Sequence, residues 1–121
     1  MGFPVDDERI ARAEDELGRK LPAVLKARLR RNNGGEVRTD NADWTLYPVY
    51  DSTDRKRIAR TANHVVREQA RWQAWRGFPE GAIAIADDGC GNALIIPADS
   101  DEIREWDHET GEHEAAVVEW D

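Results

Sequence analysis

The stretch from residue 83 to residue 112 constrains the fold of this 121-residue chain more than any other part. Its sequence, IAIADDGCGNALIIPADSDEIREWDHETGE, alternates short apolar runs with turns that are rich in Asp, Asn and Gly. We therefore predict strands over residues 82–86, 93–97 and 102–108, joined by tight turns. A fourth strand is predicted over residues 114–120, which makes the second half an antiparallel meander.

The first half of the chain has helical spacing instead. Apolar residues recur every three or four positions over residues 6–17, 22–31 and 61–75, which predicts three helices. Asp6 or Asp7, Pro22 and Thr61 are the expected starts, and Gly18, Asn32-Asn33-Gly34-Gly35 and Gly77-Phe78-Pro79 are the expected ends. Residues 44–50 predict a strand, and residues 51–60 a loop or a short helical turn.

The same spacing predicts which side chains face the core. Those of the second and third helices are Val24, Leu25, Arg28 (through its aliphatic stem), Leu29, Val65, Gln69, Trp72 and either Trp75 or Arg76. Trp44 and Trp120 are the first candidates for exposed tryptophans. The order of the elements predicts an α+β fold, in which a mainly antiparallel sheet packs against about three helices in a single domain over residues 1–121.

Charge is divided unequally along the chain. Residues 1–78 hold 16 Lys/Arg and 12 Asp/Glu, a balance of +4, whereas residues 79–121 hold 1 and 13, a balance of −12. The net charge of −8 argues against a nucleic-acid partner, because phosphates repel an acidic surface. The acidic half is either a solvated face or a surface that attracts a basic protein. The carboxylates predicted to form such a surface are Asp87, Asp88, Asp99, Asp101, Glu102, Glu105 and Glu109.

This acidic region contains residues of three kinds of chemical site. Residues 87–92 contain the acidic turn of a calcium loop but lack its alternating oxygen ligands and its final Glu, so a hairpin turn is favoured. A transition metal could be held by Asp107, His108, Glu109, Glu112 and His113, but the two histidines are five residues apart across a turn, which favours an exposed hairpin tip. Cys90 has no positively charged neighbour in sequence, so we expect a small buried or half-buried residue and not a nucleophile. We predict neither an enzyme nor a bound cofactor or metal.

Other classes of protein are disfavoured by composition. No run of about 18 apolar residues is present, which argues against a membrane-spanning helix. A single cysteine excludes an internal disulfide, and the first residues do not resemble a secretory signal. We therefore expect a cytoplasmic protein, with a monomer favoured.

Several segments, taken in order, resemble a known family. They are Ala13-Glu14-Asp15-Glu16-Leu17-Gly18 with Leu21-Pro22, then Asn32-Asn33-Gly34-Gly35, then Leu46-Tyr47-Pro48, and finally Phe78-Pro79 with residues 83–92 and 106–109. This ordered set is similar to the SUKH superfamily, also called the SMI/KNR type after a fungal cell-wall assembly regulator. The resemblance spans about residues 10–112, almost the whole chain.

The resemblance implies an α+β fold without recognised catalysis. Bacterial members of this superfamily are similar to immunity proteins, which neutralise toxin domains that are often nucleases, and other members look like adaptor or regulatory modules. The first expectation is therefore an immunity protein that occludes the active site of a cognate toxin. The alternative is an interaction module for a cellular partner. The residues that the resemblance marks as determinants of the fold are Gly34, Gly35, Pro48, Trp72, Gly89, Gly91, Asn92 and Trp106.

Overall fold

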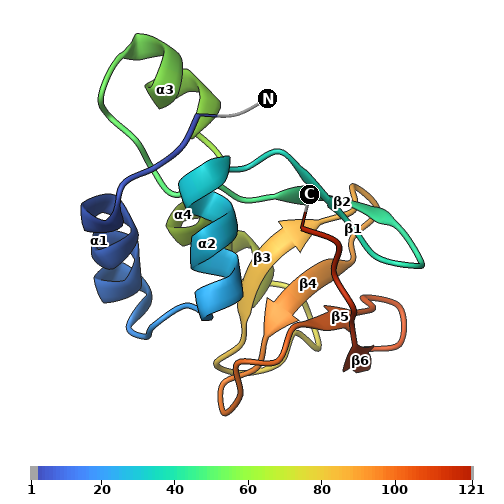
Figure 1. Cartoon of the computed structure of the whole chain (residues 1–121). Helices are drawn as coiled ribbons and strands as arrows, with labels where there is room; N and C mark the ends of the chain where they lie inside the picture. Colours follow the sequence, from blue (N-terminus) through green and yellow to red (C-terminus); the bar gives the residue numbers. More distant parts are fainter. Residues whose placement is uncertain (1–2, 121) are drawn as a thin grey trace.

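The computed structural model describes residues 3–120, which form four helices and one six-stranded sheet (Figure 1). The helices are α1 (Asp7–Leu17), α2 (Ala23–Arg31), α3 (Arg55–Arg60) and α4 (Val65–Gln73). The strands are β1 (Glu36–Arg38), β2 (Asp43–Leu46), β3 (Ile83–Asp87), β4 (Ala93–Ile96), β5 (Arg104–Trp106) and β6 (His113–Ala115). This architecture confirms the predicted α+β class.

The strands of the sheet follow one another in chain order, each antiparallel to its neighbour. The strands predicted in the acidic half are confirmed as β3, β4 and β5. The last strand is shorter than predicted, because the chain leaves β5 after Ala115 and crosses back towards β1 (Figure 1). There Arg38 and Glu119 exchange two backbone hydrogen bonds, of 3.1 and 2.7 Å. The C-terminal segment thus links the end of the meander to its first strand.

Two strands in the first half differ from the prediction. β1 was not predicted, because it has three residues and only Val37 is buried, too short for a period of two to show. β2 starts one residue earlier than expected and ends at Leu46. Tyr47 still donates from its backbone nitrogen to the carbonyl of Ile85 (2.8 Å), and Pro48, which has no N–H, then carries the chain away from the sheet.

The starts and ends of α1 and α2 are close to those predicted, whereas α4 starts later and ends earlier than expected, at Val65 and Gln73. Asp6 caps α1 by accepting a hydrogen bond from the backbone nitrogen of Arg9 (2.9 Å), and Gly18 ends α1 at a φ of 81°. Thr61, however, ends α3 and does not start α4: its hydroxyl donates to the carbonyl of Arg57 (2.8 Å) and accepts from the backbone nitrogen of Asp51 (3.0 Å). Residues 51–60 therefore include a helix.

Contacts between α4 and β3 join the helical half to the sheet. Val65, Gln69 and Trp72 are buried on the inner side of α4, as predicted. The Gln69 amide donates to the carbonyl of Ala84 (2.7 Å) and accepts from its nitrogen (2.9 Å). This pairing lies where the register of β3 against β4 shifts, between Ala84 and Ala86. Gln69 thus provides hydrogen-bond partners for backbone groups of β3, a strand in which no residue is exposed.

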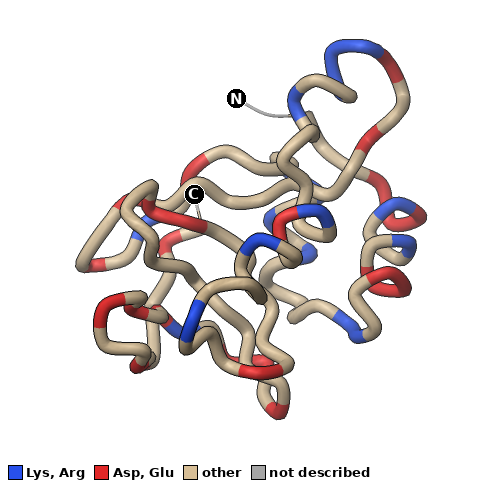
Figure 2. The backbone as a smooth tube through the Cα atoms, turned by 180° about the vertical axis from the view of Figure 1, so that it is seen from behind, with Lys and Arg blue, Asp and Glu red and all other residues tan. Residues whose placement is uncertain are grey.

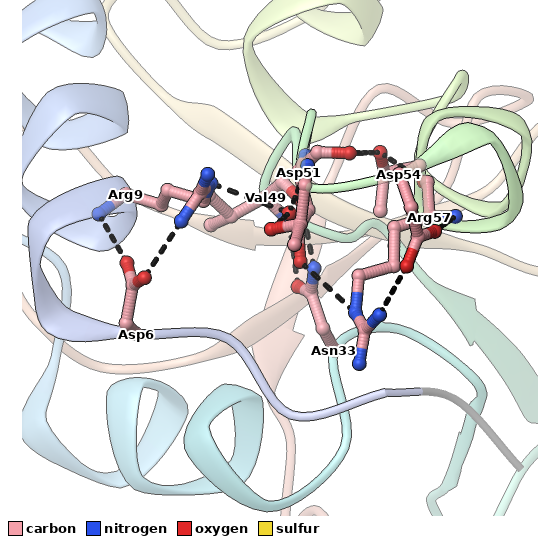
Figure 3. A network of polar contacts seen from close by, with 9 residues as sticks. Asp6, Arg9, Asn33, Val49, Asp51, Asp54 and Arg57 are labelled. Carbon is pink, nitrogen blue, oxygen red and sulfur yellow. Dashed lines mark hydrogen bonds and ion pairs between the residues drawn. The ribbon is translucent and has the colours of Figure 1, made fainter.

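A buried polar network joins α1, α3 and the connection after β2 (Figure 3). The Asp51 carboxylate lies 3.3 Å from Arg9 and 3.7 Å from Arg57, although Asp51 is only 4% exposed. Asn33 makes two hydrogen bonds with the backbone of Val49, of 2.7 and 2.8 Å. The amide of Asn33 therefore ties the end of α2 to the chain after β2. The left-handed conformation at this helix end is adopted by the next two residues, Gly34 at a φ of 104° and Gly35 at 78°.

Several exposures differ from the predictions. Trp44 is buried and not exposed, because its indole nitrogen donates to the Thr39 hydroxyl (3.0 Å) inside the molecule. Val24, predicted to be buried, is 47% exposed, and Trp120 is partly buried against the core. Trp75 lies beyond the end of α4 and is 38% exposed. Cys90 is exposed at the tip of the β3–β4 turn, which contradicts the expected burial.

Candidate functional site

A hollow of about 430 Å³ lies between the β1–β2 connection and the β5–β6 hairpin. Five carboxylates line it, and we call it the acidic hollow: they are Asp88, Glu105, Asp107, Glu112 and Glu114. Asn41, Asn92, Thr110 and His113 are its other polar residues, whereas Ala42, Trp44 and Trp106 supply apolar lining. Within residues 3–120, no Lys or Arg lines this hollow.

The position of Glu105 is fixed by the β1–β2 connection. The Thr39 hydroxyl donates to one carboxylate oxygen (2.8 Å), and the Asn41 amide donates to the other (2.9 Å). Thr39 in turn accepts from the buried indole of Trp44 (3.0 Å). Both donors to Glu105 are uncharged, so the hydrogen bonds orient the carboxylate without cancelling its charge.

Glu114 lies directly opposite Glu105 in the pairing of β5 with β6. Like charges in this cross-strand position destabilise a sheet. Glu112 and Glu114 are both exposed, and neither side chain has a hydrogen-bonding or ionic partner in the part of the chain that the structure describes. The far wall of the hollow therefore carries uncompensated negative charge.

The two hairpins beside the hollow are held together by Asn92. Asp88 accepts hydrogen bonds from the backbone of Cys90 and Asn92, at 2.8 and 3.2 Å, and from the Asn92 amide nitrogen at 2.9 Å. The Asn92 amide oxygen accepts from the backbone nitrogen of His108 (3.2 Å) and lies 2.8 Å from His108 Nδ1. Because an amide oxygen only accepts, Nδ1 carries the proton. Gly91 permits this approach, since a Cβ there would lie 3.0 Å from the same ring nitrogen.

Asp87 is directed to a different part of the molecule from Asp88. The Tyr47 hydroxyl donates to its carboxylate (2.6 Å), and Arg71 lies 3.5 Å from the same oxygen. Burial and this hydrogen bond raise the pKa of the Tyr47 phenol, which keeps the proton on the donor. Asp87 therefore joins β3 to β2 and α4 and does not line the hollow.

The β4–β5 turn places three further predicted carboxylates at the opposite end of the strands. Asp99 is exposed there, whereas Asp101 lies 3.3 Å from Arg19 and Glu102 lies 3.1 Å from Arg104. The predicted acidic surface is thus divided, because alternate turns of an antiparallel meander lie at opposite ends of the sheet. Only Asp88 and Glu105 of the seven predicted residues line the hollow; Glu109 is exposed on the β5–β6 hairpin next to it.

Three carboxylates of the hollow were absent from the predicted surface, namely Asp107, Glu112 and Glu114. The signal that identifies Glu114 is symmetry: residues 105 and 114 are equally far from the middle of the hairpin, so they pair and face the same side. Figure 2 shows acidic positions on the loops at the lower left, far from the basic positions of α3 at the upper right. The β5–β6 hairpin beside the hollow carries five carboxylates, namely Glu105, Asp107, Glu109, Glu112 and Glu114.

The carboxylates of the hollow suit the attraction of cationic groups. Among the described residues, no three His, Cys, Asp or Glu side chains are grouped so that they could hold a metal ion. None of the helices in residues 3–120 has the length and apolar character needed to cross a membrane. What the hollow offers is a concave set of carboxylates, of which Asp88 and Glu105 are held by hydrogen bonds.

Comparison with known proteins identifies a family. No curated protein matches the chain. The model of the SMI1 / KNR4 family (SUKH-1) matches residues 4–119. Since this match covers nearly the whole sequence, including every helix and strand described above, the chain belongs to the SMI1 / KNR4 family (SUKH-1).

Proposed function

We propose that this protein is a non-catalytic immunity protein, which binds a cognate protein toxin in the cytoplasm and blocks its active site. The proposal combines the family with the chemistry of the acidic hollow. Immunity proteins are among the bacterial members of the superfamily that the sequence resembles. The hollow supplies a surface on which such a toxin can be held.

The observation that carries the proposal is the uncompensated charge of the hollow. Five carboxylates line it and, within residues 3–120, no Lys or Arg does. A nuclease must attract phosphates, so the surface around its active site is usually basic. An acidic concave surface speeds the encounter with such a site and occupies the space that the substrate would take. We therefore propose a nuclease as the toxin class.

The test is a binding and protection experiment with the product of the adjacent toxin-like gene. The purified proteins are mixed, complex formation is measured by calorimetry, and nuclease activity is assayed with and without the immunity protein. We expect a 1:1 complex and loss of toxin activity. A wild-type protein that forms no complex, or that binds while the toxin stays active, overturns the proposal.

A charge-reversal pair identifies the surface. Glu112→Lys with Glu114→Lys changes two exposed residues of the hollow, and Glu80→Lys with Asp99→Lys makes the same change in charge at exposed positions outside it. The first double variant is expected to bind more weakly, with a smaller salt dependence, and the second to bind nearly as the wild type does. If both variants lose the same affinity, only the total charge matters and the hollow has no special role.

A further inference from the structure

We infer that the toxin contact extends from the acidic hollow across the β5–β6 hairpin onto Trp75. The toxin surface would then present a cluster of Lys and Arg next to an apolar pocket that accepts an indole ring. This inference rests on the proposed function, and it specifies the partner surface in more detail.

Trp75 has the properties of an aromatic anchor. The ring is 38% exposed, yet its centroid lies 6.2 Å from that of Trp72 and 6.5 Å from that of Trp106, both of which are buried. These contacts hold the indole in one orientation before any partner arrives. An ordered aromatic side chain loses little conformational entropy on binding, and Trp is enriched at the residues that dominate binding energy.

The β5–β6 hairpin connects Trp75 to the acidic hollow. The ring of His108, on this hairpin, packs edge-on against Trp75 with centroids 5.4 Å apart. Gly77, just after Trp75, also approaches the hairpin, since a Cβ on it would lie 4.0 Å from the Cα of Gly111. The same hairpin contributes Asp107 and Glu112 to the lining of the hollow. The hairpin therefore contacts Trp75 through His108 and Gly111 and lines the hollow through Asp107 and Glu112, so a partner that wraps around the hairpin meets both the indole and the carboxylates.

Two other exposed apolar side chains, Tyr50 and Ile58, lack this setting. Tyr50 is 43% exposed but packs against His64, before α4. Ile58 is 41% exposed within α3, whose sequence RKRIAR is basic and would repel a basic partner. Trp75 is followed by one exposed cation, Arg76, but its ring lies against the acidic β5–β6 hairpin, which favours a partner that is itself basic.

The experiment uses the same purified toxin and compares three variants over a range of salt concentrations. Trp75→Ala is expected to lower affinity roughly tenfold or more, because a buried aromatic contact is lost, while the salt dependence stays that of the wild type. The double variant Glu112→Lys with Glu114→Lys is expected to lower the salt dependence. Tyr50→Ala, the matched aromatic control, is expected to bind as the wild type does.

Two further measurements keep the inference falsifiable if Trp75→Ala perturbs the fold. Circular dichroism and thermal unfolding report whether the variant is folded, and Trp75→Phe retains a ring against Trp72. Acrylamide quenching of wild-type and Trp75→Phe fluorescence, free and bound, isolates the Trp75 signal, which we expect the toxin to shield. Folded Trp75→Ala that binds as tightly as the wild type, or a Trp75 signal that stays quenchable in the complex, overturns this inference alone. Absence of any wild-type complex overturns it together with the proposed function.

Discussion

Glu105 and Glu114 face each other across β5 and β6. Among the described residues 3–120, no Lys or Arg lines the hollow to offset their charges. Glu105 is held by Thr39 and Asn41, so it cannot turn away without losing two hydrogen bonds. The pair lowers the stability of the free protein. Such a cost is typical of residues that serve binding, because a basic partner would turn the repulsion into attraction.

Replacing Glu114 with Lys should therefore stabilise the free protein while it weakens the proposed complex. An opposite-charge pair in place of a like-charge pair is expected to raise the free energy of unfolding by about 0.2–1 kcal/mol. Urea denaturation at low salt measures this change, and titration with the toxin measures the affinity. Glu80→Lys makes the same change in charge in an exposed turn outside the hollow. It should change both the stability and the affinity less than Glu114→Lys does. A Glu114→Lys protein that is less stable than the wild type would contradict the repulsion.

Gly91 and Gly89 form a second matched pair, at the β3–β4 turn. Both have positive φ, 97° and 78°, so Ala at either position is expected to cost about 1–2 kcal/mol of stability. Gly91→Ala should cost more, by about 1–3 kcal/mol, because its Cβ would lie 3.0 Å from the His108 ring, whereas nothing lies within 4 Å of a Cβ at Gly89. Thermal unfolding of both variants tests the difference.

Removal of the His108 ring separates the two causes. In a Gly91→Ala, His108→Ala double variant the steric conflict is absent, so the two substitutions should cost less together than the sum of their separate effects. Additive costs would show that the ring is not the obstacle. In that case the Asn92 link between the two hairpins would not depend on the space that Gly91 leaves.

Asn33→Ala is expected to be among the most destabilising polar substitutions. The amide of Asn33 pairs with both the nitrogen and the carbonyl of Val49, and its loss leaves two buried backbone groups without that partner. At about 1–3 kcal/mol for each unpaired group, the loss should reach at least about 2 kcal/mol in urea denaturation. Asn63→Ala, at an exposed position, is the control. A similar loss in both variants would argue against the special role of the Asn33 amide.

The meander could be predicted from sequence because its signals are local. Period-two apolar runs and glycine turns determine β3, β4 and β5 within a few residues of their observed ends. The split of the acidic residues could not be predicted in this way. The Asp87 carboxylate is taken by Tyr47, 40 positions earlier, and Asp101 by Arg19, 82 positions earlier. Contacts this distant in sequence leave no trace in a local pattern.

The tryptophans show the same limit. Trp44 was a candidate for exposure and is buried, and its indole nitrogen donates to the Thr39 hydroxyl inside the molecule. Either Trp75 or Arg76 was expected to follow Trp72 on the inner side of a helix, yet α4 ends at Gln73 and the chain turns before both residues. Helical spacing predicts a face only as far as the helix continues. Trp75, for which periodicity allowed a place in the core, is therefore partly exposed.

The last prediction concerns acid stability and Asp51. Burial by itself raises the pKa of this carboxyl, but hydrogen bonds from Thr53 and the charges of Arg9 and Arg57 outweigh burial and hold it below its usual value of 3.8. A pKa that is lower in the folded state stabilises the fold at pH values above the unfolded pKa, and this contribution is lost as the pH falls through the folded pKa. Asp51→Asn should therefore cost about 1–3 kcal/mol at neutral pH and progressively less below about pH 4.

Urea denaturation of the wild type and Asp51→Asn between pH 7 and pH 3 measures this difference directly. The two stability curves should converge on the acid side, because the wild-type Asp51 then becomes protonated and loses its attraction to Arg9 and Arg57. Glu80→Gln, a neutralised carboxylate in an exposed turn, should run parallel to the wild type over the same range. The difference in unfolding free energy between the wild type and Asp51→Asn could instead stay constant down to acid unfolding. In that case the cost would arise from the shape or the hydrogen bonds of the network in Figure 3, and not from the charge of the carboxylate.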